Sequence, residues 1–215
     1  MLRRDFVRGL GLLSVLGPNV TWAAVTHALP PEGVRFTYRL LFSGTEIGTQ
    51  KVFIRSHDKA DHVVVEHEID AEVRILFSVA YSLKHRSSEL WHGFDLKSVN
   101  SDTVENGERY VIEGKDTPDG FAMNSAGRKF VAPNDVLTMD SFWLAAATKT
   151  PTVLNTRTGD TARPKITSLG DQRWHLKADF EHGPVAATIT FDGDFLAHAE
   201  IDSDGHTVTI ERVDG

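Results

Sequence analysis

The chain has 215 residues, of which 40% are hydrophobic and 25% charged, and its net charge at pH 7 is −7. This composition is typical of a globular protein of about one domain, and the negative charge argues against nucleic acid as a partner. The absence of cysteine excludes disulfides, a thiol nucleophile and thiolate metal sites.

Residues 1–28 have the pattern of an export signal that is cleaved off. Basic residues precede an apolar run at 10–16, and small-residue motifs end at Ala23 and Ala28, either of which can precede the cut. The apolar run is far shorter than the roughly 20 residues that span a membrane. We therefore expect no transmembrane span.

The first basic residues suggest the export route. Arg3-Arg4, followed by Phe6 and a further base at Arg8, resembles a twin-arginine signal. We expect the signal to engage the export machinery and the mature protein to be periplasmic. Residues 29–215 are expected to form a single β-barrel-like domain.

From Val34 onwards polar and apolar residues alternate with period two, which is typical of β-strands with one buried face. Pairs such as Asn106-Gly107 and Asp192-Gly193 separate the strands and favour hairpin turns, because glycine accepts positive φ. The expected strands are 34–42, 49–56, 62–75, 76–91, 96–104, 109–115, 121–125, 152–158, 162–169, 173–180, 185–191, 195–201 and 206–213. The sequence thus predicts an all-β fold, an antiparallel meander of about twelve strands forming a barrel or half-barrel.

One segment interrupts the strands. Residues 139–147 have helical spacing, Thr138 or Asp140 is a candidate N-cap, and Pro151 follows the end. We expect one short helix here, which either plugs one end of the barrel or covers an apolar opening.

The strand at residues 76–91 is the most informative about function. Alternate side chains of an extended strand share a face, so polar residues fall on the face that a strand normally buries. This face carries Tyr81, Leu83, His85, Ser87, Glu89 and Trp91. His67, on the preceding strand, can join them.

Two of these residues are candidate catalytic groups, His85 and Glu89. Burial raises a carboxyl pKa and lowers that of an imidazole, so a histidine and a glutamate beside an apolar cavity can act as base and acid. The candidate ligand-binding residues, which would line the cavity or orient a bound molecule, are His67, Tyr81, Ser87, Trp91, Asp140 and Trp143.

Other chemistries fit the pattern less well. Residues two apart on a strand lie roughly 6.6 Å apart, so Ser87 does not easily reach His85, and no Gly-x-Ser-x-Gly elbow supports a serine hydrolase. His67, His85 and Glu89 are a weak metal set, and we predict no metal site and no cofactor. In the structural alternative, His85 and Glu89 satisfy each other, Arg109 or a tyrosine in a buried polar seam.

The sequence carries four short motifs: Tyr81-x-Leu83-x-His85-x-Ser87-x-Glu89-x-Trp91, Asn106-Gly107-x-Arg109-Tyr110, Ser141-Phe142-Trp143 and Asn155-Thr156-Arg157-Thr158-Gly159. Together they resemble an uncharacterised family of exported bacterial β-proteins, a domain of unknown function. The resemblance covers about residues 34–213 and implies no established activity. More remotely, the strand pattern is similar to lipocalin-like barrels and curved-sheet lipid carriers.

Three functions remain open on this basis. The first is a periplasmic protein that binds a hydrophobic or amphipathic small molecule in the barrel. The second is a cofactor-free isomerase, cyclase or lyase that uses His85 and Glu89. The third is a structural protein of envelope assembly with a packed interior.

Overall fold

The computed structural model describes residues 33–59, 61–76, 78–203 and 206–213. The predicted export signal at 1–28 lies outside these ranges. Within them the chain forms β-strands and two short 3₁₀ helices. No helix in this described part is both long and apolar enough to cross a membrane.

The strands up to the helices form a run of hairpins. They are β1 (Arg35–Phe42), β2 (Thr45–Ser56), β3 (His62–Ile75), β4 (Ser78–His92), β5 (Asp95–Glu105), β6 (Glu108–Thr117), β7 (Gly120–Ser125), β8 (Arg128–Ala132) and β9 (Val136–Thr138). After the helices η1 (Met139–Trp143) and η2 (Ala145–Lys149) come β10 (Thr152–Leu154), β11 (Thr161–Ala162), β12 (Lys165–Gly170), β13 (Arg173–Phe180), β14 (Gly183–Asp192), β15 (Phe195–Ser203) and β16 (His206–Arg212).

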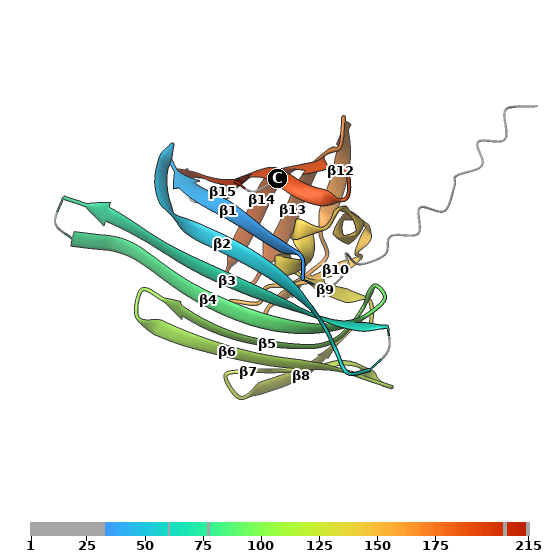
Figure 1. Ribbon diagram of the computed structural model, residues 1–215. Helices are drawn as coiled ribbons and strands as arrows, with labels where there is room; N and C mark the ends of the chain where they lie inside the picture. Colours follow the sequence, from blue (N-terminus) through green and yellow to red (C-terminus); the bar gives the residue numbers. More distant parts are fainter. Residues whose placement is uncertain (1–32, 60, 77, 204–205, 214–215) are drawn as a thin grey trace, which may run out of the picture.

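Thirteen strands form one antiparallel sheet in the order β12-β13-β14-β15-β16-β1-β2-β3-β4-β5-β6-β7-β8. The first and last long strands, β1 and β16, pair with each other. The sheet curls around a small three-stranded sheet, β11-β10-β9, and the two helices (Figure 1). The predicted all-β antiparallel meander is confirmed.

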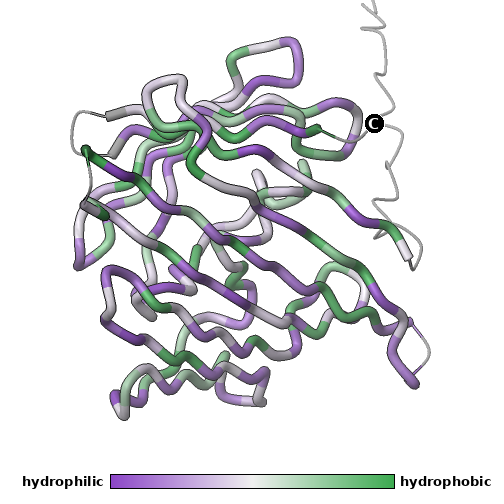
Figure 2. Tube along the Cα trace, turned by 60° about the vertical axis from the view of Figure 1, so that its left-hand side comes forward, coloured by the Kyte–Doolittle hydropathy of each residue, from purple (hydrophilic) through white to green (hydrophobic). Residues whose placement is uncertain are grey.

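The alternation read from the sequence decides which face is buried. Hydrophilic and hydrophobic residues alternate along the long strands (Figure 2), and the apolar set points inward to one large core. Its fully buried members include Tyr38, Val65, Val99, Ile112 and Leu176. Burial of such side chains, at about 1.5–3 kcal/mol each, is the main source of stability in a chain without disulfides.

The long sheet is not closed by backbone pairing, because β12 and β8 are its two outer strands. Side chains connect its ends instead. Arg128 on β8 donates to Glu181 in the β13–β14 turn at 3.1 Å and to Asp160 at 3.2 Å. Asp160 also accepts hydrogen bonds from the backbone N–H and the ring of His182.

The prediction of one helix at 139–147 was wrong in detail. Two 3₁₀ helices form instead, separated by Leu144 in an extended conformation. Leu144 makes a β-bridge with Phe195, and the backbone N–H of Ala145 donates to Asp194 O at 2.8 Å. These contacts with β15 and the preceding turn break the helix. Thr138, one of the two predicted caps, is the N-cap of η1.

Several strands also differ from the prediction. β2 begins at Thr45 and not at 49, and the strand expected at 162–169 is divided into β11 and β12. The strand expected at 152–158 ends at Leu154, because Asn155 begins a turn in which its backbone O accepts from Gly159 N–H at 2.8 Å. The strands β8 and β9 were not predicted. Both are short, five and three residues, and too brief to establish a clear alternation.

Candidate functional site

The inner face of β4 is buried as the alternation predicts. His85, Ser87, Glu89 and Trp91 are at most 5% exposed, whereas Arg86 between them is exposed. The segment at the β9–η1 junction, from Thr138 to Ser141, packs against this face through hydrogen bonds. We call the polar side chains that meet here the inner polar seam: His67, His85, Ser87, Glu89, Thr103, Thr138, Asp140 and Ser141.

One half of the inner polar seam is centred on Asp140. Its Oδ2 accepts from Ser87 Oγ at 2.8 Å and lies 3.0 Å from His85 Nε2. Burial would raise the Asp140 pKa, but the charge and hydrogen bond of His85 outweigh it, and the pKa lies well below its usual range. Asp140 is therefore ionised at neutral pH.

His85 has no ring nitrogen left to activate a nucleophile. Its Nδ1 lies 2.8 Å from Thr103 Oγ1, and its Nε2 is taken by Asp140. Ser87 donates to the carboxylate and not to the imidazole. The order of contacts is therefore not that of a catalytic triad, in which the serine donates to the histidine.

The other half is centred on Glu89, whose side chain is fully buried. Trp91 Nε1 donates to its Oε2 at 3.0 Å, and Thr138 Oγ1 donates to its Oε1. Because the Thr138 proton is used in this way, the Ser141 hydroxyl donates to Thr138 Oγ1 at 2.7 Å. The backbone N–H of Ser141 donates to the same oxygen at 3.1 Å.

His67 completes this half from β3. Its Nε2 lies 3.7 Å from Glu89 Oε2, and neither ring nitrogen has a hydrogen-bond partner in the structure. Burial lowers the His67 pKa, but the nearby Glu89 carboxylate, together with the charge of Asp140, outweighs burial and raises it. The imidazolium form is thus favoured beside two carboxylates.

Beside the inner polar seam lies an apolar pocket of about 250 Å³. The end of β4, the following turn, β9 and the two helices form it. Its lining residues are Trp91, Phe94, Leu137, Ser141, Trp143, Leu144, Ala146, Ala147 and Lys149. We call it the Trp91–Trp143 pocket.

Trp143 lines this pocket and packs against two other aromatic rings. Its ring lies nearly parallel to that of Phe195, at an angle of 4° and 6.2 Å between centroids, and 6.0 Å from that of Phe36. Trp143 is 2% exposed, and its buried Nε1 has no hydrogen-bond partner. An indole N–H without an acceptor is therefore enclosed beside an apolar pocket.

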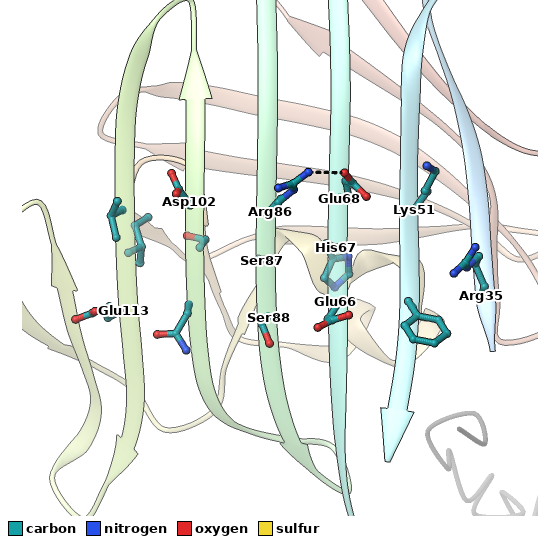
Figure 3. A pocket seen from close by; sticks show the side chains of 15 residues that line it. Arg35, Lys51, Glu66, His67, Glu68, Arg86, Ser87, Ser88, Asp102 and Glu113 are labelled. Atoms are coloured by element: carbon teal, nitrogen blue, oxygen red, sulfur yellow. Dashed lines mark hydrogen bonds and ion pairs between the residues drawn. The ribbon is translucent and has the colours of Figure 1, made fainter. Parts of the chain in front are cut away.

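A second depression, of about 650 Å³, lies on the sheet between β1 and β6 (Figure 3). Lys51, Glu68, Arg86 and Asp102 face one another in register on neighbouring strands. Arg86 donates to Glu68 at 3.0 Å. Positive and negative side chains alternate here, so the surface has no excess of one charge that would attract an ionic ligand. We interpret the depression as an ordinary solvent-exposed face of the sheet.

The structure brings most of the predicted site residues together. His67, His85, Ser87, Glu89 and Asp140 lie in the inner polar seam, and Trp91 and Trp143 line the Trp91–Trp143 pocket.

Tyr81 lies apart, next to a small second cluster of Leu40, Ala71 and Leu83. It donates to Glu105 at 2.8 Å, and burial is the main cause that raises its pKa to about 12.

The residues that join β4 to the helices are not evident from the sequence. Thr138 is a predicted cap and Ser141 belongs to a motif, but neither pattern indicates a contact with the Glu89 half of the seam. Thr103 was not identified at all, although the alternation along β5 places its side chain inward with Ser101 and Val99. The described residues contain no group of three or more metal-ligating side chains placed to hold an ion.

The fold is similar to a solved structure, the crystal structure of a beta-barrel-like protein of domain of unknown function DUF1849 from Brucella abortus. The TM-score is 0.52 at 9% sequence identity, and the alignment covers 83% of this chain and 94% of that chain. At this identity the similarity concerns the fold alone.

No curated protein matches the chain in sequence. The family described as a domain of unknown function (DUF6134) matches it over residues 38–213. That range includes β4, the inner polar seam and the Trp91–Trp143 pocket, and it confirms the resemblance to an uncharacterised β family. The chain belongs to the DUF6134 family.

Proposed function

We propose that the protein binds a small hydrophobic or amphipathic molecule in the Trp91–Trp143 pocket, in the periplasm to which its predicted signal would deliver it. The observation that carries the proposal is the buried Trp143 Nε1 beside an apolar pocket of about 250 Å³. A buried donor without an acceptor costs about 1–3 kcal/mol. Because Nε1 exposes almost no surface to the pocket, a ligand acceptor would recover this free energy after a small rotation of the indole.

The size of the pocket limits the ligand. Pockets for drug-sized ligands have volumes of about 300–1,000 Å³, and this pocket is smaller at about 250 Å³. We therefore expect a small molecule, or one end of a longer chain. Ser141 and Lys149 are the polar side chains of the lining. Ser141, whose proton goes to Thr138, can accept a hydrogen bond from a ligand hydroxyl, and Lys149 has the charge that attracts a carboxylate.

The geometry gives less support to acid–base catalysis by His85 and Glu89. Neither residue lines the Trp91–Trp143 pocket. Each is also engaged by protein groups that would have to be displaced before it could take or give a proton. In our proposal these two residues fasten the helices to the sheet and so hold one wall of the pocket.

Titration with 1-octanol and with octanoate tests the proposal, with tryptophan fluorescence as the readout. Ala146→Leu should fill the pocket and weaken binding at least about tenfold, which corresponds to about 1.4 kcal/mol. Ala197→Leu, the same change on β15 away from the pocket, is the matched control and should bind as the wild type does. A wild type that shows no saturable binding, or an Ala146→Leu variant with unchanged affinity, would contradict the proposal.

A further inference from the structure

The hairpin that joins β3 to β4 ends in apolar side chains that face solvent. Ile75 is 62% exposed, Leu76 90% and Val79 48%. We call these three residues the β3–β4 tip. The hairpin extends beyond the neighbouring β1–β2 and β5–β6 hairpins, so its end projects from the body of the sheet (Figure 1).

The turn chemistry of this hairpin differs from that of the others. Leu76, with φ at 57°, is the one bulky apolar residue among the described non-glycine residues with positive φ; the others are Ser43, Asp61, Asn106, Ala126, Asp171 and Gln172. Asparagine and aspartate suit this conformation because their short side chains can hydrogen-bond locally, whereas a bulky apolar residue is disfavoured there. Neither turn geometry nor core packing therefore accounts for an exposed leucine at this position.

We infer that the β3–β4 tip inserts into the interfacial region of a phospholipid bilayer. A stable protein–protein contact buries about 800 Å² on each partner, and a narrow projecting tip with three apolar side chains offers little such area. A bilayer interface accepts apolar side chains from a projecting segment without a complementary pocket. The shape of the tip thus suits a membrane surface better than a folded partner.

The charges around the tip indicate which lipid it meets. Arg74 and Glu72, the nearest charged residues on β3, form an ion pair with each other at 2.5 Å. The β5–β6 turn lies next to β4, since the backbone N–H of Asn106 donates to Ser82 O at 2.9 Å. This turn carries the acidic residues Glu105 and Glu108. Arg157 pairs with Glu105 at 3.4 Å, and the described residues around the tip form no cationic patch. The apolar contact therefore drives insertion, and zwitterionic lipid is sufficient.

This inference does not rest on the proposed ligand pocket. Val79 lies at the start of β4 and Trp91 at its end, so the tip and the Trp91–Trp143 pocket occupy opposite ends of the same strand. Substitutions at one leave the other intact, and the two proposals can fail separately.

Co-sedimentation with phosphatidylcholine vesicles tests the inference. The triple variant Ile75→Ser/Leu76→Asn/Val79→Ser replaces the three exposed apolar side chains of the β3–β4 tip. Asparagine at position 76 suits the positive φ, so the variant should fold. We expect its partitioning onto vesicles to fall at least about tenfold, since each apolar side chain contributes to transfer from water. The matched control is Val111→Ser/Val131→Ser/Leu169→Ser. It removes apolar side chains outside the tip that are 43%, 57% and 52% exposed.

The control should bind vesicles as the wild type does, and added salt should change binding little. A second variant, Leu76→Trp, should be quenched by brominated phosphatidylcholine. The inference is overturned if the wild type does not bind these vesicles, if both triple variants lose binding equally, or if binding requires anionic lipid and disappears at high salt. It is also overturned if the tip variant changes only the oligomeric mass measured by light scattering.

Discussion

His67 is buried beside the Glu89 carboxylate, and its raised pKa makes the stability of the protein depend on pH. In the folded state Glu89 and Asp140 favour the imidazolium over the opposing effect of burial. In the unfolded chain a histidine has a pKa of about 6.5. The folded state therefore binds this proton more tightly than the unfolded state does.

The stabilising contribution of His67 is fully present below pH 6.5, its unfolded pKa, and is lost as the pH rises through the folded pKa. We expect the free energy of unfolding, measured in urea, to be lower at about pH 8.5 than at about pH 6 in the wild type. His67→Gln should flatten this dependence. His198→Gln, at a partly exposed position of β15, is the control and should keep the pH dependence of the wild type. If His67→Gln keeps the same pH dependence as the wild type, another group is responsible.

At the scale of elements, Thr138 fastens the helices to the sheet. It caps η1 by accepting from Ser141 N–H, and it donates to the buried carboxylate of Glu89. One hydroxyl thus joins the start of a helix to β4. Asp140 makes a second connection two residues later, through its contacts with His85 and Ser87.

Thr138→Val keeps the shape of the side chain and removes these bonds. The expected loss in the free energy of unfolding is roughly 2 kcal/mol, because a cap is lost and a buried carboxylate loses a donor. Thr190→Val on β14 is the control and should change stability by less than about 0.5 kcal/mol. Thermal and urea unfolding of the two variants compare them directly, and equal effects would contradict the role assigned to Thr138.

The sequence predicted most strands and the buried face of β4, because both follow from local alternation. The partners of that face could not be predicted. Glu89 meets Thr138 across a separation of 49 residues, and His85 meets Asp140 across 55. Such contacts depend on how the sheet curls. The break at Leu144 likewise arises from its bridge to Phe195 and has no signal in the helical spacing.

For the molecule as a whole, closure depends on side chains at the ends of the long sheet. Asp160 links Arg128 on β8 to His182 in the β13–β14 turn. Burial raises the Asp160 pKa, but the hydrogen bonds and charge of His182, aided by Thr158 and Arg128, outweigh it and lower the pKa. Its contribution is therefore present above the ordinary carboxyl pKa of 3.8 and is lost as the pH falls through the folded pKa.

Asp160→Asn replaces charge-assisted hydrogen bonds with neutral ones at this junction. We expect the free energy of unfolding at neutral pH to fall by about 1–2 kcal/mol, with a smaller difference from the wild type at acid pH. Amide hydrogen exchange in β8 should become faster, because β8 is an outer strand. Asp179→Asn, on an exposed position of β13, should change neither quantity, and unchanged exchange in β8 of Asp160→Asn would contradict side-chain closure.

Native mass spectrometry tests most directly whether the Trp91–Trp143 pocket holds a ligand. The protein is purified for this from the cells that naturally produce the protein. We predict that the wild type carries a small organic molecule at a stoichiometry near one, and that Ala146→Leu, purified in the same way, carries none. A wild type with the bare mass of the chain, or an adduct retained in full by Ala146→Leu, would contradict the account.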